Sequence, residues 1–418
     1  MPDDEEYVIP EGGSVPWRNL RRDERHRPPE RDITITGVET MALAGNFTWG
    51  IVKVETDSPH YGLGETFIGE DALDIVRRYE SLVVGENPLD TRRVMEHLDQ
   101  ERTDPGSIGQ AAFAGIEIAL LDIKGKILDV PVYELLGGKF RDSVRIYCDA
   151  HAGESLGAAP DSDPREVYTP ESYAAAAREV VDAGFDALKF DLDVPTHRDR
   201  DTAARRLDND SIAHKVSLVE AVREEIGYDV DLGMDLHWSY TVETAVSLGR
   251  RLEAFDLAFL EDPVHPEKTE AGARVKRAVD IPILTGENLT SAAGFRDALA
   301  ADVVDIAAPD VAMCGGLGEL RRIAAFCDAY GVPLAPHNLG SPVATVAGAH
   351  LGASIPNFYS LEFRGGDAPW WESLVERTGE AGPVVSDGSL DVPEGPGLGI
   401  ALTDEAREYV VDEWGFVL

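Results

Sequence analysis

Residues 230–263 read VDLGMDLHWSYTVETAVSLGRRLEAFDLAFLEDP and contain one complete strand–helix–strand unit. An apolar run at 230–236 ends in polar residues, a helical period follows over 241–255, and a second apolar run at 258–262 ends in acidic residues. This order predicts two parallel strands joined by a helix, the unit from which α/β folds are built.

The same alternation of short apolar strands and periodic helical segments extends on both sides of this unit. The candidate strands are 144–150, 187–192, 230–236, 258–262, 282–287, 303–310, 332–337 and 358–363. Segments such as 211–226 and 318–330 lie between them and have a helical period. Eight strands that alternate with helices within roughly 220 residues are what a parallel (β/α) barrel requires. We therefore expect a barrel domain over residues 143–375.

The flanking segments have a different pattern. Residues 33–142 begin with two β-branched runs and continue into a long helical stretch, which predicts an α+β domain. Residues 376–418 are rich in Gly and Pro, and we expect them to return to this first domain. Residues 1–32 mix acidic, Arg-rich and Pro-rich runs without an apolar period, which is typical of a charged N-terminal extension.

The composition is strongly acidic. The 418 residues include 38 basic and 77 acidic side chains, for a formal net charge of −39. This charge would repel nucleic acid and an anionic membrane surface, so we expect neither as a partner. Only eight of the basic residues are Lys, and the excess of acidic groups indicates a surface adapted to high salt, as in a halophile.

The number of cysteines and the lengths of the apolar runs predict where in the cell the protein is found. Cys148, Cys314 and Cys327 are an odd number and have no CxxC spacing, which disfavours a disulfide framework and a zinc site. No run of eighteen apolar residues is present. We therefore expect a cytoplasmic protein.

Three carboxylates end adjacent predicted strands. Asp235, Glu261 and Glu287 follow one another at intervals of 26 residues. The C-terminal ends of barrel strands meet at one mouth, so these side chains would converge. Converging carboxylates need a cation to stay ionised, and an all-oxygen ligand set suits Mg²⁺. A chain this acidic could align three acids by chance, but the equal spacing favours a site for one Mg²⁺ per subunit.

Other ionisable groups stand at the remaining strand ends. These are Lys189 and Asp191 on the second strand, His237 on the third, Asp310 on the sixth, His337 on the seventh and Glu362 on the eighth. Positions 235 and 237 share one side of a strand, so His237 should face the mouth beside Asp235. Asp310 and His337 lie one strand apart, where the carboxylate can orient the imidazole and raise its basicity.

Some candidates have a structural explanation that is as good as a functional one. His151, His265 and His350 are of this kind, because a lone histidine is often a hydrogen-bonded structural residue. We explain Cys314 as a small packing residue and Asp191 mainly as a polar neighbour of the site. Asp191 and His265 nevertheless stay among the candidate substrate contacts.

Several short motifs, taken in order, resemble the enolase superfamily in its mandelate racemase branch, from Ile33 to the C-terminus. The motifs are ALLDIKGK (119–126), LLGG (135–138), Lys189-x-Asp191, Asp235-x-His237, Glu261-Asp262-Pro263, Gly286-Glu287, Asp310 with Gly315-Gly316, Pro336-His337-Asn338 and PGLG (396–399). Each motif is weak alone, but together they are specific.

The resemblance implies a modified (β/α)₇β TIM-like barrel with an α+β capping domain. It implies Mg²⁺ ligands at Asp235, Glu261 and Glu287. It implies that the Asp310–His337 pair removes the proton next to a carboxylate, and that Glu362 hydrogen-bonds the resulting enediolate.

Two positions distinguish reactions within this branch. Racemases similar to this branch usually have a second basic Lys at the position where this chain has Asp191. The Asp at this position argues against two-sided proton exchange. Sugar-acid dehydratases similar to galactonate dehydratase have His where racemases commonly have Asn, and this chain has His237. The resemblance therefore implies a hydro-lyase that dehydrates an aldonic acid of the gluconate, galactonate, xylonate or arabinonate class to a 2-keto-3-deoxy sugar acid.

The remaining assignments also follow from the resemblance. Lys189 would contact the substrate carboxylate or C2 hydroxyl, His237 would protonate the leaving C3 hydroxyl, and Asn46 and Trp49 would contact the sugar from a capping-domain loop. The branch implies a homo-oligomer built from dimers, up to an octamer. The alternatives are a racemase or epimerase of a hydroxy acid and a non-catalytic metal-binding relative.

Overall fold

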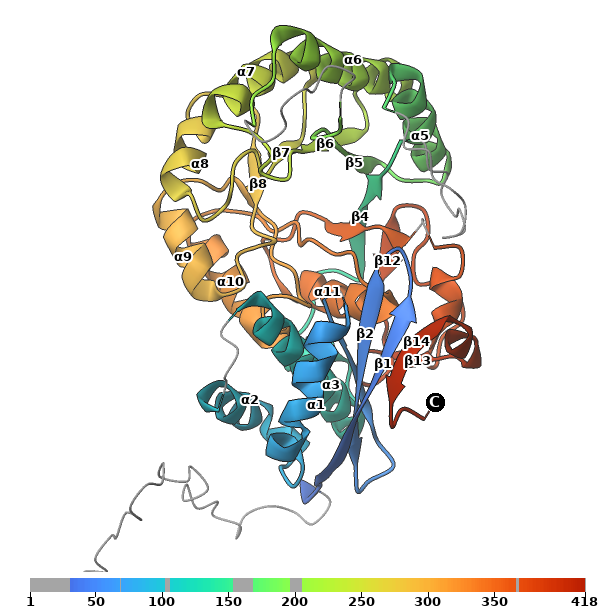
Figure 1. Ribbon diagram of the computed structural model, residues 1–418. Coiled ribbons are helices and arrows are strands. Elements are labelled where there is room, and N and C mark those ends of the chain that lie inside the picture. The colour runs from blue at the N-terminus through green and yellow to red at the C-terminus, as the bar shows by residue number, and fades with distance from the viewer. Residues whose placement is uncertain are drawn as a thin grey trace, which may run out of the picture.

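The computed structural model describes residues 31–67, 69–101, 106–152, 168–195, 205–365 and 368–417. The expected N-terminal extension over 1–32 lies outside the described residues except for positions 31 and 32. Figure 1 shows a ring of helices around a curled sheet, with a second group of helices and strands packed at one end of it.

The ring is a parallel α/β barrel, as predicted. Its strands are β4 (Ser143–Ala150), β5 (Ala187–Asp191), β6 (Asp231–Asp235), β7 (Phe259–Glu261), β8 (Ile283–Thr285), β9 (Ile306–Ala307) and β10 (Leu361–Phe363). Its helices are α5 (Pro170–Asp182), α6 (Asn209–Ile226), α7 (Val242–Leu252), α8 (Thr269–Lys276), α9 (Ala292–Ala300), α10 (Leu317–Ala329) and α11 (Pro342–Ser354). The strands pair in chain order from β4 to β9, and β10 pairs with β4.

The seventh position in the ring is shorter than the sequence predicts. We expect a strand over 332–337, but the structure forms only single bridges at Leu334, to Ala307 on one side and Phe358 on the other. Pro333 and Pro336 flank this residue and have no N–H to donate, so the ladder cannot extend. The two bridges connect β9 to the segment that leads into β10.

The barrel interior has two layers. The lower layer is apolar and consists of Tyr147, Ala187, Phe259, Leu284, Ile306, Ala308 and Ala335. Gly233 makes room for one of its largest members, because a Cβ at this position would lie 2.2 Å from the Phe259 ring. The layer closes the bottom of the barrel, and the buried charged side chains of the site lie above it, near the C-terminal ends of the strands.

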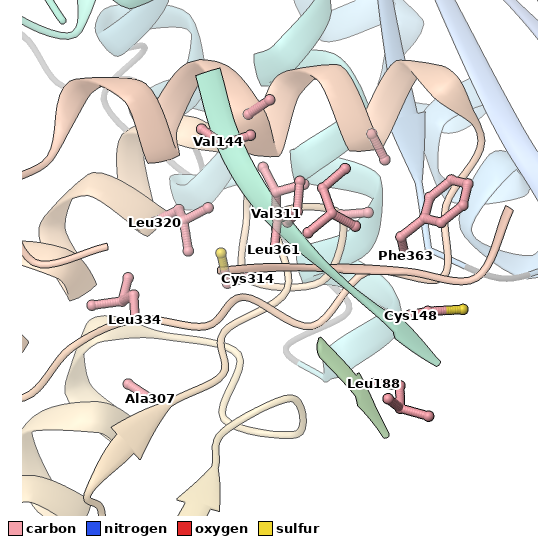
Figure 2. Packing of buried hydrophobic residues seen from close by; sticks show 14 of the residues in the cluster. Val144, Cys148, Leu188, Ala307, Val311, Cys314, Leu320, Leu334, Leu361 and Phe363 are labelled. Carbon is pink, nitrogen blue, oxygen red and sulfur yellow. The ribbon is translucent and has the colours of Figure 1, made fainter. Parts of the chain in front are cut away.

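Side chains on the outer face of the strands pack against the helices. Figure 2 shows Val144 and Cys148 of β4 with Leu361 and Phe363 of β10 in this hydrophobic cluster. Because side chains alternate along a strand, Glu362 between the last two points into the barrel. Burial of such apolar side chains stabilises the fold by roughly 2 kcal/mol each.

The second group of elements is the capping domain. A four-stranded antiparallel sheet has the order β14–β1–β2–β3. The elements are β1 (Ile35–Ala44), β2 (Thr48–Thr56), β3 (Gly62–Thr66), α1 (Glu70–Val83), α2 (Thr91–Gln100), α3 (Ser107–Leu128) and β14 (Val410–Trp414). Gly64 allows α3 to lie directly on β3, because a Cβ there would be 1.9 Å from the Gly115 carbonyl oxygen.

Short elements connect the two parts. They are α4 (Val132–Leu135), β11 (Val375–Arg377), β12 (Ser389–Asp391) and β13 (Ile400–Leu402). β12 pairs antiparallel with β4, and β11 pairs with β13. Within the described parts of the chain, no helix has the length and apolar character needed to cross a membrane.

A buried carboxylate of the capping domain binds the start of α11. Glu65 on β3 accepts hydrogen bonds from the backbone N–H groups of Ser341 and Ala344, both at 2.8 Å, and from the Ser341 hydroxyl at 2.6 Å. Burial outweighs these bonds and raises the pKa of Glu65 to about 7. The carboxylate satisfies N–H groups that the first turn of a helix leaves unpaired.

Glu117 on α3 binds the start of α10 in the same way. It accepts hydrogen bonds from the backbone N–H groups of Leu317 at 2.8 Å and Gly318 at 3.1 Å. Gly316 is necessary for this approach, because a Cβ there would lie 2.4 Å from a Glu117 carboxylate oxygen. Burial raises the pKa of Glu117 to about 7. Two capping-domain acids therefore fix the orientation of the capping domain on the barrel.

Candidate active site

A charged layer lies in the barrel directly above the apolar one. Lys189 on β5 is its centre, with its Nζ 3.1 Å from Asp235 Oδ2, 2.9 Å from Glu261 Oε2 and 2.6 Å from Glu362 Oε1. All four residues are buried. The two-residue period of β5, β6, β7 and β10 turns these side chains inward from four different strands.

Negative charge exceeds positive charge in this layer. Burial disfavours the charged form of Lys189, but the surrounding carboxylates outweigh it and raise its pKa well above the usual value. Burial and the charge of Asp235 raise the pKa of Glu261 well above its usual range. Glu261 Oε1 and Asp262 Oδ2 are buried without a hydrogen-bond partner among the residues described. Unpaired buried oxygens of this kind require an explanation, such as a bound ion.

The three predicted metal ligands, Asp235, Glu261 and Glu287, lie in or beside the charged layer. Asp235 and Glu261 are register partners on β6 and β7. Glu287 follows β8, and its Oε2 lies 3.2 Å from His337 Nε2. Burial raises the pKa of Glu287, and the charge of Asp235 raises it further. A surplus of buried carboxylates with unpaired oxygens fits a divalent cation that prefers oxygen ligands.

A second group could also offer ligand atoms to a cation. Atoms of Asp191, Asp193 and His237 lie within 4.8 Å of one another. These side chains are between 25% and 38% exposed, and His237 Nδ1 is already 3.3 Å from Asp193 Oδ1. The acids of the charged layer fit a cation better, because they are buried and Glu261 keeps an oxygen without a hydrogen-bond partner among the residues described.

His337 and Asp310 form a close pair. His337 Nδ1 lies 2.7 Å from Asp310 Oδ2, and both side chains are buried. The other oxygen of Asp310 accepts a hydrogen bond from the Ala312 N–H at 2.6 Å, which holds the carboxylate in place. Burial lowers the pKa of His337, but the negative charges of Glu287 and Glu362 outweigh it and raise the pKa to about 10. Nε2 of His337 therefore faces the acidic layer.

His237 stands on the other side of the acidic layer. Its backbone has φ 39°, in the left-handed region that non-glycine residues seldom adopt, and its N–H donates to Asp235 Oδ1 at 2.9 Å. Its Nε2 lies 3.6 Å from Asp235 Oδ2. Burial lowers the pKa of His237, but a hydrogen bond to Asp193 and the charge of Asp235 raise it to about 10. Strained backbone of this kind often occurs at functional sites.

Of the two predicted substrate contacts of the capping domain, Asn46 lies in the loop between β1 and β2, and Trp49 lies at the start of β2. Asn46 Nδ2 donates to the Arg364 carbonyl at 3.1 Å. Trp49 is 1% exposed, and its Nε1 donates to the Leu339 carbonyl at 2.8 Å. Both side chains therefore hold loops of the barrel mouth, and a direct contact of either with substrate stays a prediction.

The other two predicted contacts are at the mouth itself. Asp191 lies 3.6 Å from His151 Nδ1 and 3.8 Å from His237 Nδ1. Burial and the charge of a neighbouring carboxylate raise the pKa of Asp191 to about 7. His265 is half-buried, and its ring centroid is 5.8 Å from that of Trp238. The structure brings Asp191 next to His237, whereas the ring of His265 packs against Trp238.

Sequence reasoning missed three residues of the mouth, Asp149, Asp193 and Arg364, and left the role of His151 undecided. Asp149, His151 and Arg364 are joined by ion pairs, and Asp193 contacts His237. The two-residue period was the available signal, because 149 and 151 continue one inward face and 191 and 193 another. No other sequence feature distinguished Asp193 as a site residue, because the chain has so many acidic residues.

Comparison with known proteins gives consistent matches along the chain. Residues 27–137 match the mandelate racemase / muconate lactonizing enzyme N-terminal domain, and residues 172–406 match the enolase C-terminal domain-like family. The chain is 42% identical over 381 residues to D-xylonate dehydratase of Haloferax volcanii, covering 90% of this chain and 89% of that protein.

Two further proteins are also similar to this chain. D-galactarolactone cycloisomerase of Agrobacterium fabrum is 31% identical over 367 residues, covering 85% of this chain and 89% of that protein. A crystal structure of a mandelate racemase/muconate lactonizing enzyme-like protein from Rubrobacter xylanophilus has a TM-score of 0.82 and 38% identity, covering 90% of this chain and 98% of that one.

Proposed function

The chain belongs to the mandelate racemase and muconate lactonizing enzyme family of the enolase superfamily, and from this premise we propose that it is a hydro-lyase that dehydrates an aldonic acid. The observation that carries the proposal is the placement of two histidines on opposite sides of one acidic layer. His337 lies against Glu287, and His237 lies against Asp235. Elimination of water needs both a base and an acid, and one histidine is available for each.

Asp235, Glu261 and Glu287 would hold one Mg²⁺. When bound, the cation would supply positive charge for the substrate carboxylate and would offset the charge of Glu287 that raises the pKa of His337. The unpaired oxygen of Glu261 supports this assignment.

The chain's own residues would then act in sequence. His337 Nε2 removes the C2 proton, while Asp310 orients the ring through Nδ1. Lys189 Nζ contributes positive charge where charge develops on the carboxylate, and Glu362 hydrogen-bonds that group. His237 gives a proton to the C3 hydroxyl, which leaves as water. The enol that forms becomes a 2-keto-3-deoxy sugar acid by gaining a proton at C3.

A substrate panel tests the proposal. Five- and six-carbon aldonic acids are incubated with the protein and Mg²⁺ in molar salt, and the 2-keto acid is followed by semicarbazide absorbance. We expect a signal with one or two aldonates that disappears with EDTA. Product with altered stereochemistry and no loss of water would indicate a racemase or epimerase. No turnover of any acid by folded protein would contradict the enzymatic role.

A variant separates the two proton transfers. We expect His237→Asn to retain exchange of the C2 proton with deuterium oxide while dehydration falls by about a hundredfold or more. Equal loss of both reactions would contradict a role for His237 as the acid. The expected cytoplasmic location, adaptation to high salt and homo-oligomeric state stay predictions.

A further inference from the structure

A polar cavity adjoins the proposed catalytic residues. It has a volume of about 240 Å³ and is lined in part by His151, Asp191 and Arg364. These residues come from the ends of three neighbouring strands, β4, β5 and β10. Tyr168 and Tyr173 form part of its wall. The cavity is thus built by the barrel itself at its C-terminal end, where ligands bind in this architecture.

A buried carboxylate lies behind the cavity. Asp149 is 3% exposed, and its Oδ2 is 3.3 Å from His151 Nε2 and 3.4 Å from Arg364 Nη1. Its other oxygen, Oδ1, has no hydrogen-bond partner in the described parts of the chain. A buried acceptor without a donor is costly, and a ligand or an ordered water would satisfy it.

Asp191 lines the cavity and also lies beside His237, one of the proposed catalytic residues. One oxygen of Asp191 lies 3.6 Å from His151 Nδ1, and the other lies 3.8 Å from His237 Nδ1. His237 is the residue that we assign to the C3 hydroxyl of the substrate. The carbons beyond C3 would therefore extend from His237 toward His151 and Arg364.

Charge in the cavity indicates the chemical class of the group it binds. Two basic side chains of the lining, His151 and Arg364, contact two carboxylates, Asp191 in the lining and Asp149 behind it. Hydroxyl groups both donate and accept hydrogen bonds, so such alternating partners suit them. A second carboxylate would need surplus positive charge, but the carboxylates of Asp149 and Asp191 offset the charge of His151 and Arg364.

We propose that His151, Asp191 and Arg364 form the subsite that binds the hydroxyl groups beyond C3 of a sugar monoacid. The assignment rests on the proposed dehydration of an aldonic acid. It gives the enzyme a way to choose a polyhydroxylated monoacid over a short acid and over a diacid.

The capping domain supports the proposed subsite. The Phe47 ring centroid lies 5.3 Å from the guanidinium carbon of Arg364, and Asn46 donates a hydrogen bond to the Arg364 carbonyl. Cation–π contact and this hydrogen bond hold Arg364 at the cavity. The loop between β1 and β2 thus contributes to the subsite by positioning Arg364.

Binding measurements test the subsite without requiring turnover. Calorimetry in Mg²⁺ and molar salt uses the His337→Asn background, in which the aldonate is not consumed. It compares the tighter-binding of two five-carbon aldonates, xylonate and arabinonate, with glycerate, which lacks the distal hydroxyls, and with the matching five-carbon diacid. We expect the aldonate to bind at least tenfold more tightly than either. Equal binding of aldonate and glycerate, or tighter binding of the diacid, would overturn the proposal.

Two variants assign the preference to the named residues. In Arg364→Met and His151→Phe, we expect the tenfold preference for aldonate over glycerate to fall to less than threefold. Two variants are used because either one alone could fail to fold, which circular dichroism detects. Arg322→Met, an exposed arginine of α10, is the matched control and should keep the full preference. A preference that persists in both folded variants would overturn the assignment.

The outcome is distinguishable from failure of the proposed function. Tight aldonate binding with no 2-keto acid from the wild-type protein would reject dehydration but retain the subsite. Turnover with an unchanged aldonate preference in both variants would reject the subsite but retain dehydration.

Discussion

Buried carboxylates occur in two regions of the molecule, and they differ in how completely their oxygens are paired. At the interface between capping domain and barrel, Glu65 and Glu117 accept hydrogen bonds from the first turns of two helices. In the barrel mouth, Glu261 and Asp262 each keep an oxygen without a partner among the residues described. Both regions are buried, so exposure alone does not explain the difference.

The difference separates a structural role from a functional one. A buried charge stabilises a fold only when hydrogen bonds or opposite charges compensate for the loss of water. The interface acids have that compensation from the protein itself. Glu261 and Asp262 have it only in part, because Lys189 and Thr285 contact one oxygen of each and the other oxygen stays unpaired among the residues described. This is expected where a cation and a substrate complete the site. We therefore expect substitutions in the mouth to reduce activity and substitutions at the interface to reduce stability.

The largest expected effect is in the mouth. Replacing His337→Asn removes the proposed base, so kcat for 2-keto acid formation should fall by about a thousandfold or more. The free energy of unfolding should change far less, by about 1 kcal/mol. Assay of 2-keto acid and exchange of the C2 proton in deuterium oxide measure the first effect, and chemical denaturation measures the second. Exchange at the wild-type rate would contradict the assignment.

The next largest effect is at the interface. Glu117→Ala leaves the N–H groups of Leu317 and Gly318 buried and unpaired, which should lower the free energy of unfolding by about 3 kcal/mol. Glu96→Ala, at an exposed position on the neighbouring α2, is the control and should change it by less than about 0.5 kcal/mol. Urea denaturation at neutral pH measures both. Equal losses of stability in Glu117→Ala and Glu96→Ala would contradict a structural role for the interface acid.

The third effect depends on pH. His350 is buried, its Nδ1 accepts from the Tyr133 N–H at 3.3 Å and its Nε2 lies 3.0 Å from the Leu398 carbonyl. Burial lowers its pKa from 6.5 to about 4. The unfolded chain therefore binds a proton more readily, and stability is complete above pH 6.5 and declines as pH falls toward 4.

The comparison that isolates this histidine uses His350→Asn. Between pH 7.5 and pH 5, the wild-type protein should lose about 2 kcal/mol more stability than the variant. Denaturation at both pH values measures the difference. Identical losses in the two proteins would show that His350 is not the titrating group.

The smallest expected effect comes from breaking one hydrogen bond between the capping domain and the barrel mouth. Trp49→Phe keeps an aromatic ring but removes the pyrrole part of the indole, whose N–H donates to the Leu339 carbonyl in the loop that follows His337. We expect a loss of about 1 kcal/mol in stability. Since the same loop carries the proposed base, kcat should also fall, by less than about tenfold. Trp414→Phe, on β14, is the exposed control and should leave kcat unchanged.

Much of the fold can be predicted from the sequence. The alternation of strands and helices predicts the barrel because its strands are short apolar runs that end in polar residues. The seventh strand is an exception, since Pro333 and Pro336 prevent a ladder that the apolar pattern suggests. The candidate site was predictable where side chains recur at strand ends, as for Asp235, Glu261 and Glu287.

Other features depend on contacts between distant parts of the chain. Glu65 and Glu117 look like any other acid in a sequence with 77 of them, and only tertiary structure brings each to a helix in the other domain. Trp49 is expected at the substrate from its loop position, yet its N–H binds a backbone carbonyl. Sequence patterns report local periodicity, whereas these partners lie more than 190 residues apart.

We propose that the acids of the barrel mouth, such as Glu261, bind a cation and that the interface acids Glu65 and Glu117 do not. The direct test is thermal unfolding of the wild-type protein, Glu261→Gln and Glu117→Gln, with and without Mg²⁺ in molar KCl. We predict that Mg²⁺ raises the Tm of the wild-type protein and of Glu117→Gln but not that of Glu261→Gln. Without Mg²⁺, Glu261→Gln should be at least as stable as the wild-type protein, because Lys189 keeps Asp235 and Glu362 as partners while the excess of buried negative charge falls. An equal rise in Tm for all three proteins would contradict the claim.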